Sequence, residues 1–296
     1  MTHALRQPFL LGLLLLAATT PAAAFDLVAK PVTTTMPDGA SLVVLAYVTA
    51  PDTTVAPPGG PVLTVNQGDT VTVNLTNGLA ESTGIHFQGQ PIVPDLAGIA
   101  PGATGTYTFT ASSPGTFLYE AGLVPGTEHQ AARGLHGVLI VRPTDAPAQA
   151  YASLATAFDD EAILVLGEID PALHASASPA AFDLRDYQPW YFLLNGKAYP
   201  ATDPIPTAPG RRVLIRFANA GLQQHSMTLL GAQMLLVGKD GNELAHPVLR
   251  VAETIAPGET LDAIVTVPAG TASGVKLAVF DGSLKLHNGR AAGFGG

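Results

Sequence analysis

Cysteine is absent from this chain of 296 residues, and charged residues make up only 12% of it. Without thiols the fold has no disulfides, and the chain alone builds no thiol nucleophile, zinc thiolate site or blue-copper centre, because each of these needs cysteine. Phosphate-binding glycine loops and Gly-x-Ser-x-Gly elbows are also missing. The sequence therefore gives no support to nucleotide-dependent or esterase chemistry.

Basic clusters are missing as well. The chain has 14 Lys and Arg against 23 Asp and Glu, which gives a net charge of -9. An acidic chain without runs of Lys or Arg is a poor partner for nucleic acid or for anionic membrane surfaces. We therefore expect no nucleic-acid partner.

Long apolar runs are lacking after the N-terminus. Residues Met1–Ala24 combine Arg6, the apolar run Phe9–Ala18 and the small-residue end Pro21–Ala24. This pattern predicts a secretory signal peptide cleaved after Ala24. The apolar run is shorter than the roughly 20 residues of a membrane span, and no later stretch approaches that length. The sequence thus predicts a periplasmic or secreted protein with no transmembrane anchor after cleavage.

Short stretches of alternating apolar and polar residues recur between glycines and prolines. In Thr70–Thr76, for example, Val71, Val73 and Leu75 share one face of a strand. Gly210–Ala218 repeats the pattern. The 31 Gly and 25 Pro then mark turns, and the chain is predicted to be all-β, built as sandwiches.

One unit occurs twice. Gly68–Asn77 matches Gly210–Asn219 at an offset of 142 positions. Further on, Ala100-Pro101-Gly102 matches Ala256-Pro257-Gly258 at an offset of 156, so the second unit contains an insertion, which we place around Lys239–His246. Such internal similarity indicates duplicated domains.

Composition sets the domain boundaries. We predict a first domain over 25–143, a linker rich in Ala, Pro, Thr and Ser over 144–159, and a second domain over 160–288. The Gly- and Ala-rich segment 289–296 is predicted to be a flexible tail. A further loose stretch, His174–Ala181, is predicted to be a surface loop.

A set of ordered motifs in the mature chain resembles the first two cupredoxin domains of multicopper oxidases. The resemblance implies two cupredoxin-like Greek-key β-sandwich domains. In the first unit the resemblance rests on the segments Val65–Val73, Gly84-Ile85-His86-Phe87-Gln88-Gly89 and Gly115–Val141. In the second unit it rests on Tyr191–Pro200, Val213–Gly221, Lys239-Asp240-Gly241 and Ala256–Asp262.

The family's copper ligands carry over poorly. His86 stands at the first position of the family's first His-x-His, but Gln88 stands at the second, and Glu120 and Gly122 replace the next pair. The mature chain contains no His-x-His, although the family's trinuclear cluster uses four. Copper remains a candidate cofactor, but we expect neither a trinuclear cluster nor type 1 copper from this chain alone.

Four residues are candidates for a remnant metal site: His86, Glu120, His129 and His136. The resemblance places their segments at one end of the first domain, and imidazole and carboxylate suit Cu(II) or Zn(II). The alternative is a hydrogen-bonded polar cluster at a domain interface, which we favour because isolated histidines are more often structural. No catalytic residue is assigned.

Two further sets have competing interpretations. His225 with Met227 and Met234 resembles a copper-handling group, but Met227 lies in an apolar strand and is predicted to be core. The acids Glu120 and Asp281 each follow an aromatic residue late in a unit. They are interpreted as solvated loop acids rather than an acid–base pair, because nothing in the sequence brings them together.

Two functions follow from these patterns. The favoured hypothesis is an exported cupredoxin-fold protein that acts as a binding or assembly module, or as a weak metal binder. The alternative is a copper-dependent oxidoreductase of the multicopper oxidase type, whose copper sites are completed in trans by a homo-oligomer or by an envelope partner subunit. Fold alone does not decide between them.

Overall fold

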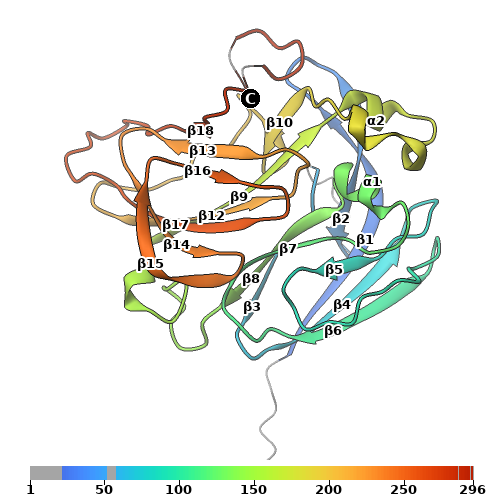
Figure 1. Cartoon of the computed structure of the whole chain (residues 1–296), viewed down its shortest axis with the longest axis horizontal. Helices are drawn as coiled ribbons and strands as arrows, with labels where there is room; N and C mark the ends of the chain where they lie inside the picture. The colour runs from blue at the N-terminus through green and yellow to red at the C-terminus, as the bar shows by residue number, and fades with distance from the viewer. Residues whose placement is uncertain (1–21, 52–57, 286, 294, 296) are drawn as a thin grey trace, which may run out of the picture.

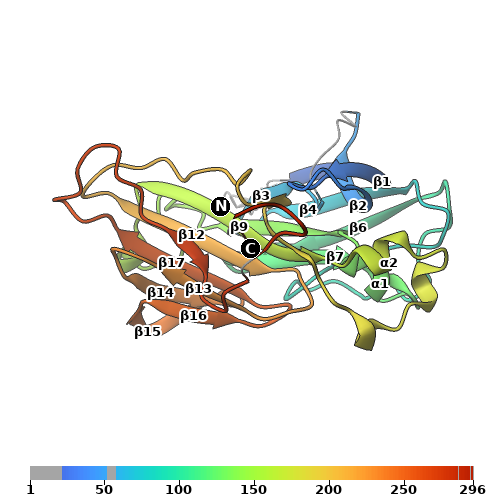
Figure 2. The same ribbon diagram turned by 90° about the horizontal axis from the view of Figure 1, so that it is seen from above.

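The computed structural model describes residues 22–51, 58–285, 287–293 and 295. It shows two β-sandwiches packed side by side, the first built from β1 to β8 and the second from β9 to β18 (Figures 1 and 2). The predicted all-β class is confirmed. The predicted signal peptide lies largely outside the described residues, but Ala22–Ala24 already pair with Thr70–Thr72 as the start of β1.

The first sandwich consists of two four-stranded sheets, ordered β2-β1-β4-β6 and β3-β8-β7-β5. The alternating residues Val71, Val73 and Leu75 are fully buried between them, as predicted. The elements are β1 (Ala22–Thr35), β2 (Ser41–Thr49), β3 (Val62–Asn66), β4 (Thr70–Asn77), β5 (Ile85–Phe87), β6 (Thr104–Thr110), β7 (Gly115–Ala121), α1 (Thr127–Ala132) and β8 (His136–Arg142).

The second sandwich packs a seven-stranded sheet, β11-β10-β9-β12-β17-β14-β15, against a three-stranded one, β16-β13-β18. Its elements are β9 (Asp160–Ile169), α2 (Pro171–Ala175), β10 (Tyr191–Leu194), β11 (Lys197–Ala198), β12 (Arg212–Asn219), β13 (His225–Leu229), β14 (Met234–Lys239), β15 (Asn242–Arg250), β16 (Ala252–Ile255), β17 (Thr260–Thr266) and β18 (Val279–Asp281). Short 3-10 helices form at Leu154–Thr156, Pro179–Ala181 and Leu184–Asp186.

Paired asparagines confirm the duplication. Asn77 ends β4, and its side-chain amide donates to the carbonyls of Glu81 and Ile99 at 2.8 Å each. Asn219 ends β12, and its amide donates to the carbonyls of Gln223 at 2.8 Å and Ile255 at 2.9 Å. Each amide thus ties its strand to a loop four residues ahead and to the loop or strand end before the Ala-Pro-Gly turn. The two units share this arrangement down to individual hydrogen bonds.

The inserted segment is the β14–β15 hairpin, whose tip reaches the first sandwich. Gly241 at the tip has a φ of +69°, and a side chain there would run into the ring of Phe117. A side chain on Gly115 would lie 2.7 Å from the Cα of Gly241. The two sandwiches therefore touch through glycine backbones, at a point where no Cβ fits.

Gly241→Ala is expected to lower the free energy of unfolding by about 2–3 kcal/mol, because it adds a steric clash to the strain of a left-handed residue. Gly210→Ala is the matched control. Its φ is +83° and nothing lies within 4 Å of its added methyl group, so it should cost only about 1 kcal/mol. Urea unfolding measures both changes. If the two variants lose the same free energy of unfolding, the methyl group at position 241 causes no steric clash.

The segment between the sandwiches and the C-terminal end both contact the folded body. β8 ends at Arg142 and β9 begins at Asp160, which is where the sequence places the linker. Tyr151 within this segment is buried. In the predicted flexible tail, Gly289 donates its backbone N–H to Trp190 and Arg290 donates to Asp38. Tail mobility beyond these contacts stays a prediction.

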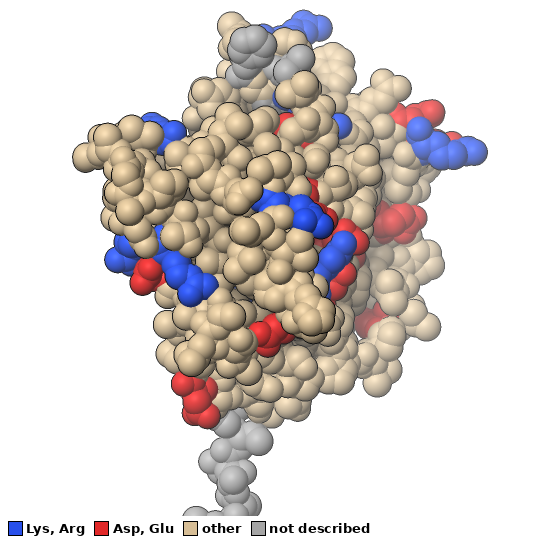
Figure 3. Space-filling model, turned by 60° about the vertical axis from the view of Figure 1, so that its left-hand side comes forward, with Lys and Arg blue, Asp and Glu red and all other residues tan. Residues whose placement is uncertain are grey.

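Charges on the surface are sparse. On the face shown in Figure 3, Lys and Arg lie beside Asp and Glu rather than in a patch of one sign. Within the described residues, no helix is long and apolar enough to cross a membrane.

Candidate metal site

Three of the four candidate residues, His86, Glu120 and His136, belong to the sheet that carries β5, β7 and β8. His86 is opposite Glu120 in the pairing of β5 with β7, and Glu120 is opposite His136 in the pairing of β7 with β8. Because side chains alternate across a strand, Phe117 and Tyr119 enter the core of the first sandwich, while Leu118 faces the second. His86, Glu120 and His136 are therefore on the side of the sheet that faces the second sandwich.

His86 and Glu120 form a side-chain pair. His86 Nε2 lies 3.5 Å from Glu120 Oε1, and Gln88 Nε2 donates to the same carboxylate oxygen at 3.0 Å. His86 Nδ1 lies 3.2 Å from the carbonyl oxygen of Ala121. A carbonyl oxygen only accepts, so Nδ1 is the donor in this contact, and Nε2 is the ring nitrogen that faces the carboxylate.

This pair has the chemistry of two metal ligands. A metal-binding histidine commonly donates its other ring N–H to a carbonyl, as His86 does to Ala121. The separation of 3.5 Å is near that of two ligand atoms on one tetrahedral ion with bonds of about 2.1 Å. Both side chains keep solvent access, with exposed fractions of 22% and 24%. A blue-copper centre does not fit, because the chain has no cysteine.

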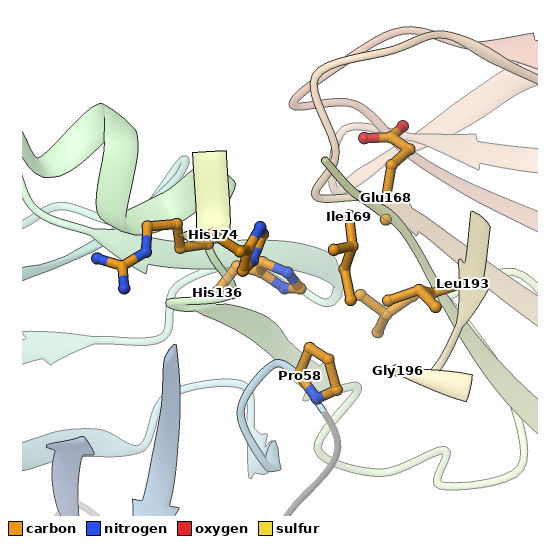
Figure 4. A pocket seen from close by; sticks show the side chains of 11 residues that line it. Pro58, His136, Glu168, Ile169, His174, Leu193 and Gly196 are labelled. Carbon is orange, nitrogen blue, oxygen red and sulfur yellow. The ribbon is translucent and has the colours of Figure 1, made fainter. Parts of the chain in front are cut away.

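Within the described part of the chain, the other two candidates, His129 and His136, form no side-chain hydrogen bond or ion pair with the His86–Glu120 pair. His129 sits on α1, and its Nε2 lies 2.8 Å from the carbonyl oxygen of Phe182 in the second sandwich. His136 is buried, and burial lowers its pKa to about 4. It lines a cavity with His174 (Figure 4) rather than joining Glu120. Among the residues that the structure describes, no group of three or more His, Cys, Asp or Glu side chains is arranged to hold a metal.

The interface beside the pair begins with an apolar strip. Leu118, Val138 and Ile140 on the first sandwich pack against Ala218 and Ala220 on the second. The alternation of Gly210–Ala218 alone predicts burial on one face, but β12 and β17 are buried on both. Ala218 is covered by this strip, and Leu214 and Ile264 are covered by Ala150 and Tyr151 of the segment between the sandwiches.

Next to this strip lies a buried ionic network centred on Arg216. Its Nε contacts Glu161 Oε1 at 2.7 Å and its Nη1 contacts Asp262 Oδ2 at 3.1 Å. Thr116 of the first sandwich donates to Asp262 at 2.6 Å, and Tyr151 donates to it at 2.7 Å. Burial alone would lower the pKa of Arg216, but the two carboxylates raise it above its usual value. The guanidinium is therefore a permanent cation held between two acids.

A second buried group centres on His225. Its Nε2 lies 2.6 Å from Glu168 Oε1 and its Nδ1 lies 2.8 Å from Asp281 Oδ2. Burial alone would lower the pKa of His225, but hydrogen bonds with Asp281 and Glu168 raise it to about 9. Burial would likewise raise the pKa of Asp281, but bonds from His225, Ser283 and Ser226 lower it to about 2. An imidazolium clamped by two carboxylates thus ties β13 to β9 and β18.

Some sequence-based interpretations need correction. Asp281 is not a solvated loop acid, because it is buried against His225. His174 does not lie in a surface loop but on α2, where it is buried. Met227 and Met234 are core residues of the second sandwich, as predicted.

Sequence reasoning missed Arg216 although a signal was present. Leu214, Arg216 and Ala218 share one strand face, and a lone charge between two apolar residues indicates burial with a partner rather than exposure. No comparable signal marks Glu168, whose partner His225 is 57 positions away.

Comparisons with known proteins agree with this architecture. A family model described as multicopper oxidase matches residues 57–146. Laccase-3 of Oryza sativa subsp. japonica is 28% identical over 235 residues, which cover 70% of this chain and 39% of the rice protein. Multicopper oxidase MmcO of Mycobacterium tuberculosis is 25% identical over 259 residues, covering 74% of this chain and 48% of that protein. The chain thus spans less than half the length of these curated relatives.

Solved structures match over more of their length. The blue copper oxidase from Nitrosomonas europaea superimposes with a TM-score of 0.79 at 26% identity, covering 93% of this chain and 84% of that one. The multicopper oxidase mgLAC gives the same values.

Proposed function

Because this chain belongs to the multicopper oxidase superfamily, we propose that it is an exported, non-catalytic binding module of that superfamily, with a weak metal site formed by His86 and Glu120. The observation that carries the proposal is the pair itself. One anchored imidazole and one carboxylate lie 3.5 Å apart on a solvent-accessible edge of the interface. Two ligands with water in the remaining positions give a weak site, unlike the closed four-ligand sites that stabilise folds.

The residues around the pair support binding rather than redox chemistry. The chain has no thiolate to form an electron-entry copper. Gln88, which stands where the family has its second histidine, uses its amide to hold Glu120. A metal at this position would keep the His86 contact to Ala121 and replace the amide bond on Glu120.

Metal titration of the purified chain tests the site. Isothermal titration calorimetry with Cu(II) or Zn(II) should give one ion per chain, and His86→Ala should weaken affinity at least about tenfold, the lower end for loss of groups supporting a metal. Gln88→His should strengthen binding, because it adds an imidazole beside Glu120. His246→Ala is the matched control, since His246 is exposed on β15 and should leave the affinity unchanged.

Two results would contradict the proposal. If wild type and His86→Ala bind the metal with equal affinity, His86 is not a ligand and the proposed metal site is wrong. If the chain alone binds stoichiometric copper and oxidises a phenol or a metal ion, the proposal of a non-catalytic role is wrong.

A second function is favoured by the solvent access of the pair. Side chains of His86 and Glu120 remain partly exposed, so ligands from another chain could complete the coordination and create a copper oxidoreductase in trans. This alternative predicts copper uptake only by an assembled complex, and its loss on His86→Ala. Copper content that is unchanged in the mutant complex would exclude it.

A further inference from the structure

Strand β6 has one open side. It pairs only with β4, at the end of the sheet β2-β1-β4-β6, and it lies along the lower rim of the first sandwich in Figure 1. Beyond its two ends, Asn77 N–H donates to the carbonyl of Ala103, and Ala111 N–H donates to that of Asp69. Odd-numbered residues of β6 therefore turn their backbone groups towards β4, because these groups alternate along an antiparallel strand.

The outward groups belong to the even-numbered residues. These are Thr104, Thr106, Thr108 and Thr110, all of them exposed. Within the part of the chain that the structure describes, no hydrogen bond is made to the N–H or C=O of any of the four. A row of free donors and acceptors of this kind is a template for another strand.

Other sheet edges in the described residues are short, covered or blocked. The strands β5, β11, β16 and β18 have at most four residues, and β3 has five. Leu45 of β2 donates its N–H to the carbonyl of Arg133. The long edge strand β15 contains Pro247, Glu243 and Arg250, and its register with β14 is interrupted. By contrast, β6 has seven residues without a proline, a charge or a break in register, so it lacks the usual protection of an edge.

The sequence of β6, Thr-Gly-Thr-Tyr-Thr-Phe-Thr, complements itself. If two copies are placed antiparallel about Tyr107, Thr106 meets the partner's Thr108, and Thr104 meets the partner's Thr110. Opposed threonines stabilise antiparallel strands, and the chain already contains such a pair, since the hydroxyl oxygens of Thr76 and Thr104 lie 2.9 Å apart. The net charge of -9 opposes association of two copies in general, but this edge brings no like charges together.

A groove of about 500 Å³ runs beside β6 and gives room for a second strand. Its other wall is the loop that contains Ile92 and Val93, and the side chain of Val93 is 86% exposed. Asp95 fixes this loop, because it accepts from the Tyr107 hydroxyl of β6 and from the N–H of Gly98, at 2.8 Å each. The wall is thus formed before association, and covering its apolar side chains favours binding.

We propose that β6 is a dimerisation edge, to which a second copy of this chain adds its own β6 in antiparallel register centred on Tyr107. The two four-stranded sheets then form one sheet of eight strands. Both copies use the same edge, so assembly stops at two chains. The contact does not involve the His86–Glu120 pair, which belongs to the other sheet of the first sandwich.

Light scattering combined with gel filtration of the whole chain tests the edge. The average mass should rise with protein concentration towards twice that of one chain. Thr106→Lys combined with Thr108→Lys opposes lysine to lysine, and should lower the association constant at least about tenfold. Thr106→Glu combined with Thr108→Glu should do the same. An equimolar mixture of the two double variants should restore the dimer, because opposite charges then meet.

A matched control adds the same charge to another strand. Thr33→Lys combined with Thr35→Lys changes two exposed threonines of β1, and this variant should associate like wild type. The proposal is wrong if wild type keeps the mass of one chain at every concentration, if its mass exceeds two chains, if the lysine variant of β6 associates like wild type, or if the mixture of folded variants stays monomeric.

Hydrogen exchange of the wild type decides the question if the variants of β6 do not fold. The amides of Thr104, Thr106, Thr108 and Thr110 should exchange more slowly as the protein concentration rises, because the second strand accepts their hydrogen bonds. Exchange that does not depend on concentration would overturn the proposal.

Discussion

Arg216→Met is expected to lower the free energy of unfolding by about 3–5 kcal/mol, the range for removing one partner of a buried ion pair. Arg216 has no solvent exposure, and it lies between Glu161 and Asp262. Methionine fills most of the volume but carries no charge. Asp262 would then keep only the hydrogen bonds from the hydroxyl groups of Thr116 and Tyr151. The carboxylates of Glu161 and Asp262 would no longer have the guanidinium between them.

Urea unfolding with a double-mutant cycle separates charge from packing. Arg216→Met combined with Asp262→Asn should lose less than the sum of the single losses, because the neutral amide no longer needs the guanidinium. Arg211→Met is the control, since Arg211 pairs with Asp160 on the surface of the same sheet, and it should change stability little. Additive losses in the cycle would mean that Arg216 acts only by filling space.

Stability is also expected to fall as the solution becomes alkaline, through His225. Its pKa is about 9 in the folded chain against an ordinary 6.5. The folded state thus binds the proton more tightly, and the contribution is complete below about pH 6.5 and lost as the pH rises through about 9. A difference of this size corresponds to about 3 kcal/mol. Chemical denaturation at several pH values measures it.

His225→Gln should flatten that pH dependence. Glutamine can still donate one hydrogen bond to Glu168 or Asp281, but it does not titrate. Stability at neutral pH should fall towards the value that the wild type reaches near pH 9, and should change little between. His246→Gln, at the exposed position on β15, should leave the wild-type slope intact. A variant with the same slope as wild type would show that another group carries the alkaline loss.

Much of the fold could be predicted because its signals are local. Strand alternation in Thr70–Thr76 reports burial on one face, and the shared Gly–Asn frame of the two units reports duplication. The change of offset also located the β14–β15 hairpin. Such patterns need no knowledge of distant contacts, since each depends on neighbouring residues and on turns.

The sites could be predicted only in part. The closeness of His86 and Glu120 could be predicted because the resemblance implied that their two segments lie at one end of the first domain. In the structure the two residues are opposite each other on adjacent strands. The partners of Arg216 lie 46 to 100 positions away, and their pairing depends on how one sandwich sits on the other. The segment after β9 likewise brings His174 to His136 from across the interface. The sequence pattern within one unit contains no information on how the two sandwiches pack against each other.

The apolar strip of Leu118, Val138 and Ile140 has a consequence for biosynthesis. A chain emerges from its N-terminus, so all strands of the first sandwich are available once Arg142 has been made. Ile163 and Val165, which pack against the strip, follow about 20 positions later, but Ala218 and Ala220 come more than 70 positions later. During that interval the folded first sandwich exposes an apolar sheet face, and nascent chains are then most prone to aggregate. Chaperones that bind extended apolar sheet should act on this protein before Ala220 emerges, and release it afterwards.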